Sequence, residues 1–253
     1  MAETRSPFDL SGLTALVTGA SRGIGAGCAI ALAKSGADLV LAARNANDLE
    51  TIADEIRQLG RSVNTIAGDV TDGTAMQAAI SAAPPIHVLV NNAGTNIPGP
   101  FVDVTPEHFD SIMDINVRAA FFIAQAVSAR MIEQNIKGSI IHMSSQMGHV
   151  GAVNRTVYCT SKHAVEGLTK AMAVELAPHS IRVNSVAPTF IETPMTKPFL
   201  DDDAFRESVL AQIPLGNVGQ IEDVTGAVVY LASPASRMVT GSCLKVDGGW
   251  TAR

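Results

Sequence analysis

Short apolar runs recur along the whole chain, and each is separated from the next by a segment of helical periodicity. Runs in which nearly every position is apolar are typical of strands that are buried on both faces, as in a parallel sheet. Glycine or a polar cluster follows most of these runs. The predicted strands are residues 15–18, 38–42, 63–67, 88–91, 139–143, 181–187 and 243–246.

The segments between the runs predict helices. One is rich in small residues, one is amphipathic, one begins at a capping threonine followed by proline, and one long helix lies past the middle of the chain. Repeated alternation of strand and helix predicts an α/β protein with a three-layer doubly wound (Rossmann) fold and a seven-stranded, mainly parallel sheet. The predicted helices are residues 24–34, 49–59, a region from Thr105, and 157–176.

Composition narrows the class of protein. The 253 residues include 47% hydrophobic but only 4% aromatic side chains, so aliphatic packing must form the core. The net charge is −6 and no basic run occurs, which argues against a nucleic-acid partner. The N-terminus lacks the apolar core of a signal peptide, and no apolar run reaches the roughly 20 residues of a membrane span.

The three cysteines are odd in number and widely spaced. This pattern predicts neither a disulfide framework nor a zinc site, so no metal is expected. A reducing, cytoplasmic location is the simplest interpretation.

A glycine-rich segment, Thr-Gly-Ala-Ser-Arg-Gly-Ile-Gly, joins the first strand to the first helix. Glycines there permit a tight turn and a close approach of the backbone to a pyrophosphate, which the N–H groups of the helix N-terminus can bind. The alternative is a turn that needs glycine only for packing. The position between strand and helix favours dinucleotide binding by Gly19, Ser21, Arg22, Gly23, Ile24 and Gly25.

The end of the second strand indicates which dinucleotide binds. An acidic residue there would bond the ribose 2′-hydroxyl of NAD, but this strand ends in Ala42, Ala43 and Arg44. Arg44 and Arg22 can instead hold a 2′-phosphate, which favours NADP over NAD. The alternative is that both arginines are ordinary surface residues.

Tyr158 and Lys162 are four residues apart, so a helix would carry both on one face. A nearby positive charge favours the phenolate and lowers the pKa of a tyrosine, which can then exchange a proton with a carbonyl or hydroxyl oxygen. The same spacing also occurs on ordinary solvated helices.

Taken together, these motifs resemble the short-chain dehydrogenase/reductase family in its compact single-domain branch, from Leu13 to Gly249. The resemblance implies one domain, residues 1–253, that binds the dinucleotide and carries the catalytic site. It assigns adenine contacts to Asp69 and Val70. It assigns the remaining cofactor contacts to Asn92, Ala93, Gly94, Tyr158, Lys162, Pro188, Thr189 and Ile191.

The resemblance also implies a mechanism of reversible hydride transfer between nicotinamide and a carbonyl or secondary alcohol. Tyr158 would be the general acid and base, and Lys162 would lower its pKa and bind the nicotinamide ribose. Ser145, thirteen positions before the tyrosine, would orient the substrate oxygen. Asn116 would hold a water that replaces the proton. Members of the family also suggest a homotetramer, with the helices after Asn116 and around Tyr158 between subunits.

The substrate is a small carbonyl or alcohol compound, for which Ser145, Met147, Asn154 and Tyr158 are the predicted contacts. The stretch 193–219 contains three prolines and predicts a lid over this site. The lid resembles those of sugar-acid oxidoreductases such as gluconate 5-dehydrogenase, so a sugar acid or polyol is one candidate. A β-ketoacyl thioester, as in β-ketoacyl-carrier-protein reductases, is the alternative.

Two other functions are weighed against this one. A regulatory protein that binds the cofactor without turnover would not need the complete catalytic set. A nucleotide-sugar epimerase of the extended branch would need a further C-terminal domain, for which four residues after Gly249 leave no room. Departures from the family are Thr189, where glycine is common, and His87, where aspartate is usual. The Thr189 side chain can narrow the pocket or hydrogen-bond the nicotinamide amide. His149 is expected either at the pocket or at the surface.

Overall fold

A computed structural model describes residues 6–252 of the chain. Its centre is a sheet with the strand order β3-β2-β1-β4-β5-β6-β7, in which all six neighbouring pairs are parallel. The predicted doubly wound fold with seven strands is therefore confirmed. The strands are β1 Thr14–Thr18, β2 Asp38–Ala43, β3 Val63–Ala67, β4 Val88–Asn91, β5 Ser139–Met143, β6 Arg182–Pro188 and β7 Cys243–Val246.

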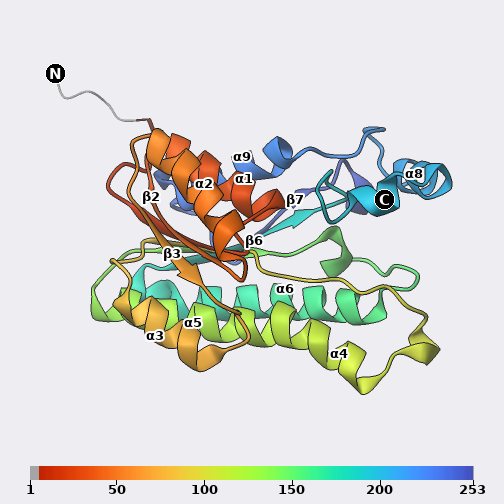
Figure 1. Ribbon diagram of the computed structural model, residues 1–253, viewed down its shortest axis with the longest axis horizontal. Coiled ribbons are helices and arrows are strands. Elements are labelled where there is room, and N and C mark those ends of the chain that lie inside the picture. The colour runs from red at the N-terminus through yellow and green to blue at the C-terminus, as the bar shows by residue number, and fades with distance from the viewer. Residues whose placement is uncertain (1–5, 253) are drawn as a thin grey trace.

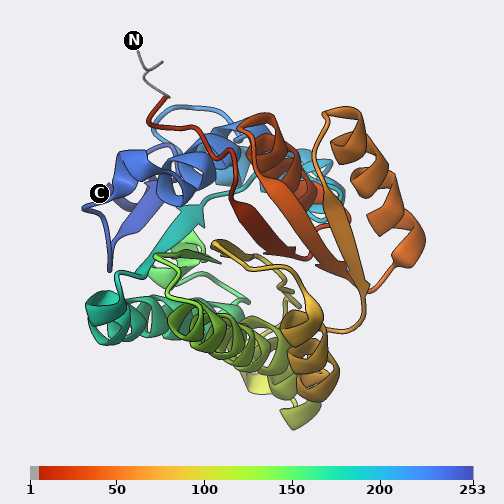
Figure 2. The same ribbon diagram turned by 90° about the vertical axis from the view of Figure 1, so that its left-hand side faces the viewer.

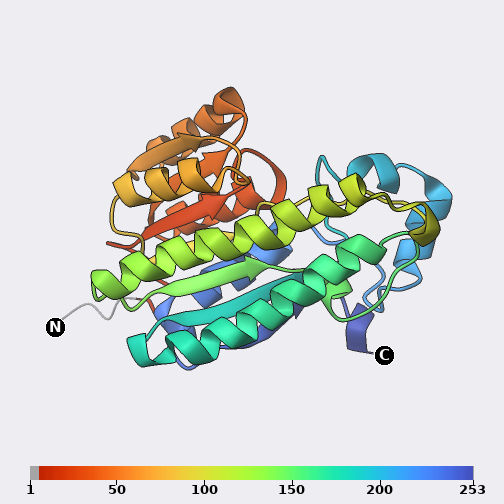
Figure 3. The same cartoon turned by 90° about the horizontal axis from the view of Figure 1, so that it is seen from below.

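Helices cover both faces of the sheet (Figures 1 and 2). On one face lie α1 (Gly23–Lys34), α2 (Ala46–Gln58) and α9 (Ile221–Ala232). On the other lie α3 (Gly73–Ala82), α4 (Pro106–Met113), α5 (Ala120–Glu133) and α6 (Thr156–Leu176). Figure 3 shows the long helices of this second layer running side by side across the sheet.

Aliphatic side chains form a core on each side of the sheet. Successive residues of a strand point to opposite faces, so Val17 packs beneath α1 and α9 while Leu16 packs toward α5. The largest side chains with less than 2% exposure are all leucine, isoleucine or methionine. The low aromatic content is thus compatible with a fully packed core.

The helix over Pro106–Glu133 contains one irregular section. Thr105 caps it, with its hydroxyl accepting a hydrogen bond from the His108 N–H at 3.2 Å, and Pro106 takes the first position. Residues Asp114–Ala119 then form a π-helical segment between α4 and α5. Such segments often occur at functional sites, and this one contains Asn116.

By length and composition alone, this 28-residue helix could cross a membrane, with a mean hydropathy of 1.3 in its apolar window. It is the only such helix within residues 6–252. It packs against β4, α3 and α6, which is the behaviour of a core helix in a layered α/β protein.

The predicted lid, 193–219, contains structure that its sequence pattern did not indicate. It forms two short helices, α7 (Lys197–Leu200) and α8 (Asp203–Leu210), beyond the carboxyl ends of the strands (Figure 1). Leu200, Val209, Ile213 and Val218 form a small core of their own. The segment is therefore a folded cap, and its movement over the site stays a prediction.

Candidate active site

A cavity of about 550 Å³ opens at the carboxyl ends of the strands. It lies where the strand order changes direction, since β2 and β3 extend to one side of β1 and β4 to the other. Doubly wound proteins bind their ligands at this point. Every residue predicted to bind the dinucleotide lines the cavity, namely Gly19, Ser21, Arg22, Gly23, Ile24, Gly25, Arg44, Asp69, Val70, Asn92, Ala93, Gly94, Tyr158, Lys162, Pro188, Thr189 and Ile191.

The glycine-rich turn uses backbone conformations and close contacts that favour glycine. Gly19 and Gly23 adopt positive φ angles of 65° and 58°. A Cβ on Gly25 would collide with the carbonyl of Gly19 and lie 2.5 Å from Asn92 Nδ2. No side chain caps the first N–H groups of α1, so they remain available to a pyrophosphate. This cradle fits a dinucleotide.

The two predicted arginines both line the cavity, Arg22 at the start of α1 and Arg44 after β2. Arg44 directly follows β2, with 72% of its side chain exposed, and its Nη1 lies 4.0 Å from Asp69 Oδ2. Asp69 is oriented by Thr71, whose N–H and hydroxyl donate to it at 2.9 and 2.8 Å. These two hydrogen bonds and the Arg44 charge lower the pKa of Asp69.

Three of the four predicted catalytic residues, Ser145, Tyr158 and Lys162, line the cavity together. Ser145 follows β5, and Tyr158 and Lys162 share one face of α6. The Ser145 hydroxyl is close enough to Tyr158 to favour the phenolate and so acts to lower the pKa of Tyr158. The Lys162 ammonium donates to the Met143 carbonyl at 2.8 Å and lies 5.6 Å from the centre of the Tyr158 ring.

Asn116 lies behind this group and does not line the cavity. It is only 2% exposed, and the π-helical segment turns its amide toward β4 and α6. Its Nδ2 donates to the Thr95 carbonyl at 2.9 Å and to Ser161 Oγ at 3.0 Å. Its Oδ1 accepts from the Thr95 N–H at 2.8 Å. Asn116 therefore positions the chain beside the catalytic residues.

Burial controls the electrostatics of the catalytic pair. Desolvation raises the pKa of Tyr158 to about 12, against the hydrogen bond with Ser145 and the charge of Arg155. The sequence suggested that Lys162 would lower this pKa, but its ammonium faces the ring and a backbone carbonyl. Burial also lowers the pKa of Lys162 to about 8, against the charge of Glu166. The phenol therefore holds its proton at neutral pH.

Two of the four predicted substrate contacts lie outside this cavity, and their contact with a substrate stays a prediction. Ser145 and Tyr158 line it, but Met147 and Asn154 do not. After Ser145 the chain turns into the 3₁₀ helix Gln146–Gly148, which buries Met147 within the protein. Asn154 is exposed in a loop, where it adopts a φ of 58°. Short-range spacing from Ser145 did not reveal this turn.

Several cavity residues were missed in the sequence. Thr95, Ile97, Ser111 and Ile115 come from the segment after β4, and Thr193, Pro194 and Thr196 come from the cap. The only indication of these residues in the sequence was that they follow the ends of strands β4 and β6. Within residues 6–252, the buried hydroxyl of Thr189 has no hydrogen-bond partner, which leaves it able to bond a nicotinamide amide.

The histidines are separate from the cavity. His142 is 1% exposed in β5, and burial lowers its pKa to about 4, so it is a neutral packed residue as expected. His149 does not line the cavity. It is partly buried and contacts Cys243 and Glu166 instead.

Comparison with known proteins agrees with this geometry. A family model described as enoyl-(acyl carrier protein) reductase matches residues 19–251. A short-chain type dehydrogenase/reductase from Mycobacterium marinum is 43% identical, with a TM-score of 0.92 and coverage of 97% of this chain and 98% of that one. This chain belongs to the short-chain dehydrogenase/reductase family.

Relatives with named activities are oxidoreductases acting on alcohol and carbonyl groups. L-xylulose reductase from Mus musculus is 40% identical over 96% of this chain and 98% of its own. Gluconate 5-dehydrogenase from Burkholderia cenocepacia J2315, in complex with NADP and tartrate, is 35% identical with a TM-score of 0.94, covering 98% of each chain. The chain is thus an oxidoreductase of this kind, and the alternative of a regulatory protein without turnover is not supported.

The proton role of Tyr158 can be tested with the two tyrosines of the chain. Tyr158→Phe removes the hydroxyl, so we expect kcat to fall by about 10²–10⁴-fold, the usual contribution of general acid–base catalysis. Dinucleotide affinity should change little, because the ring is retained. Tyr230→Phe, on α9 and outside the cavity, is the matched control and should retain activity. Equal turnover by wild type and Tyr158→Phe would exclude the assigned role.

Proposed function

We propose that this protein is an NADP-dependent oxidoreductase that interconverts a ketone and a secondary alcohol on a sugar acid or polyol. The observation that carries the proposal is that Ser145, Tyr158 and Lys162 line the same cavity as the glycine cradle. A dinucleotide bound in the cradle would extend toward these three side chains.

The proposed preference for NADP rests on the side chains expected to face the adenosine ribose. Arg22 and Arg44 both line the cavity, and no carboxylate occupies the end of β2 to bond a ribose 2′-hydroxyl. A guanidinium that is exposed and held only by a 4.0 Å ion pair can turn toward a 2′-phosphate at little cost. The Burkholderia relative with NADP is consistent with this choice.

The residues of the chain would act on the substrate oxygen. The dinucleotide, when bound, supplies or accepts a hydride at the substrate carbon. Tyr158 donates its proton to the oxygen in reduction and removes it in oxidation. Ser145 orients that oxygen. The Ser145 hydroxyl is itself held by the Met147 N–H at 3.1 Å and by Gln146 Oε1 at 2.7 Å, so its position is fixed before a substrate binds.

The proton that Tyr158 gives to the substrate would be replaced by way of the space between Lys162 and Asn116. A Cβ on Gly94 would lie 3.2 Å from Asn116 Oδ1 and 3.7 Å from Lys162 Nζ. The absence of that carbon leaves a space between the two polar groups that suits a bridging water. We assign this water the role of returning a proton to Lys162 and then to Tyr158.

Hydroxyl groups around the inner cavity support a polyhydroxylated substrate. Thr95, Ser111, Thr193 and Thr196 line it, and Ser144 adds a buried hydroxyl without a hydrogen-bond partner inside the described range 6–252. Such groups can bond several hydroxyls of a sugar acid or ketose. L-xylulose and gluconate occur in the names of the relatives described above.

The proposal also includes a homotetramer in the cytoplasm. Large apolar side chains remain exposed on the outer helices, with Phe121 and Phe122 of α5 at 43% and 44% and Val174 of α6 at 79%. Apolar groups gathered on neighbouring helices favour contact with another copy. Light scattering of the purified protein should give four chains per particle, and a monomer at micromolar concentration would overturn the assembly. The free thiols of Cys28, Cys159 and Cys243 suit a reducing compartment.

A substrate panel tests the function. We expect kcat/KM with NADPH to be highest for a keto-sugar acid or ketose, by on the order of 100-fold over a simple ketone, because a site built to bond hydroxyls discriminates against compounds that lack them. Initial rates for 5-ketogluconate, L-xylulose, a β-ketoacyl thioester and cyclohexanone make the comparison. A preference for the thioester would establish the alternative function.

Arg44→Asp tests the cofactor choice. A carboxylate there repels a 2′-phosphate and can bond a ribose hydroxyl, so the preference for NADPH over NADH should fall by about 10–100-fold, as expected for one hydrogen bond to a charged group. Arg57→Asp makes the same charge change on α2, outside the cavity, and should leave the ratio unchanged. An unaltered ratio in Arg44→Asp would refute the role of this arginine.

A further inference from the structure

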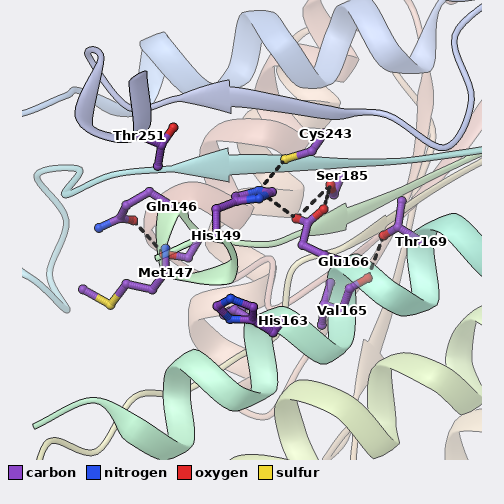
Figure 4. Close-up of polar contacts among 12 residues, drawn as sticks. Gln146, Met147, His149, His163, Val165, Glu166, Thr169, Ser185, Cys243 and Thr251 are labelled. Atoms are coloured by element: carbon purple, nitrogen blue, oxygen red, sulfur yellow. Dashed lines mark hydrogen bonds and ion pairs between the residues drawn. The ribbon is translucent and has the colours of Figure 1, made fainter. Parts of the chain in front are cut away.

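Three potential metal ligands from distant parts of the chain meet beside the catalytic helix (Figure 4). His149 follows the 3₁₀ helix after Ser145, Glu166 lies one turn beyond Lys162 on α6, and Cys243 begins β7. The cavity of the active site does not include any of them. The assigned catalytic steps do not use them either.

The three ligand atoms converge on one point. His149 Nε2 lies 3.2 Å from Cys243 Sγ and 3.6 Å from Glu166 Oε1, and all three atoms lie within 4.8 Å of one another. Tetrahedral zinc, with bonds of about 2.0–2.3 Å, requires ligand atoms roughly 3.3–3.8 Å apart. The cluster therefore needs only small side-chain adjustments to enclose the ion.

The surroundings prepare each side chain for a cation. Glu166 is 5% exposed, and Ser185 Oγ lies 3.0 Å from each of its oxygens, which fixes the carboxylate (Figure 4). Such hydrogen bonds to a ligand are typical of metal sites. Burial lowers the pKa of His149, which favours the neutral ring that binds a metal.

The charge of the three ligands also matches that of a divalent cation. A carboxylate, a thiolate and a neutral imidazole together carry two negative charges, which match a divalent cation in a largely buried site. Burial raises the pKa of Cys243 to about 12, so this thiol stays protonated until a strong cation displaces the proton. The displaced proton leaves to solvent, which reaches the partly exposed His149.

We propose that His149, Glu166 and Cys243 bind one Zn²⁺ per chain, with a water molecule as the fourth ligand. The ion would join the loop after Ser145, helix α6 and strand β7, and so stabilise the elements that carry the catalytic residues. It is a structural site, separate from the chemistry at Tyr158. Ligand spacings of 17 and 77 residues explain why the sequence pattern did not indicate it.

Binding of Zn²⁺ and Co²⁺ to the metal-free protein tests the proposal. We expect one Zn²⁺ per chain by calorimetry and a rise in the unfolding temperature. Co²⁺ should give the intense visible bands of a tetrahedral site and a thiolate charge-transfer band in the near ultraviolet. No binding at micromolar Zn²⁺, or cobalt spectra without a thiolate band, would overturn the proposal and leave a cluster held only by hydrogen bonds.

Variants locate the ion. Cys243→Ala and His149→Gln should each abolish the thiolate band or the stoichiometric binding, whereas Cys28→Ala, a buried cysteine of α1, should retain both. Ser185→Ala keeps all three ligands but loses the bond to Glu166, so zinc affinity should fall by about 10–100-fold. Circular dichroism in the absence of metal confirms that each variant is folded. Unchanged affinity in Cys243→Ala would place the metal elsewhere and reject the site.

Discussion

The active site depends on a line of buried polar side chains along one face of helix α6. Tyr158, Lys162 and Glu166 are spaced by four residues, so they lie one above another on the side that faces the sheet. Lys162 bonds the last carbonyl of β5, and Glu166 bonds Ser185 of β6. A buried charge that loses such a partner costs several kcal/mol, so the helix cannot rotate or slide. The position of the Tyr158 hydroxyl is fixed because this helix is fixed.

The same helix is also tied to the layer beside it. Ser161 accepts a hydrogen bond from Asn116, which reaches it because the preceding helix contains a π-helical segment. That segment accommodates an extra residue per turn and directs the amide of Asn116 inward. Asn116 in turn holds both backbone polar groups of Thr95 after β4. One side chain thus connects α6 to the strand whose end lines the cavity.

Prediction of the fold and site from the sequence was most accurate where the local backbone conformation or burial requires one type of residue. The predicted strands 63–67, 88–91, 139–143 and 243–246 agree with the structure to the residue. Of these, 88–91 and 139–143 are buried along their whole length, as apolar runs of this kind indicate. Gly25 could be assigned because its close approach to Gly19 excludes any side chain. These features depend on neighbours along the chain, or on a turn whose geometry only glycine permits.

Prediction was weaker where contacts between distant segments decide the outcome. Spacing from Ser145 could not show that the chain turns at once into a 3₁₀ helix and buries Met147. The cap forms two helices because its apolar residues pack on Phe190 and Trp250, which lie outside the segment. The pKa of Tyr158 also depends on contacts between distant segments. The nearby lysine is visible in the sequence, whereas the burial that raises the pKa of Tyr158 is set by the whole fold.

Burial has opposite effects on the two catalytic groups, and the combination is useful to the chemistry. Desolvation disfavours both the phenolate and the ammonium, so it raises the pKa of Tyr158 to about 12 and lowers that of Lys162 to about 8. The two pKa values, which nearly coincide at 10.0 and 10.5 in the free side chains, are therefore drawn apart and reversed in order. A proton passing from Lys162 to a phenolate formed during reduction moves to the stronger base. Because the phenolate is the less stable form, its reprotonation is favourable and the site returns to its donating state. In the proposed mechanism, the burial of these two groups thus sets the direction of proton return.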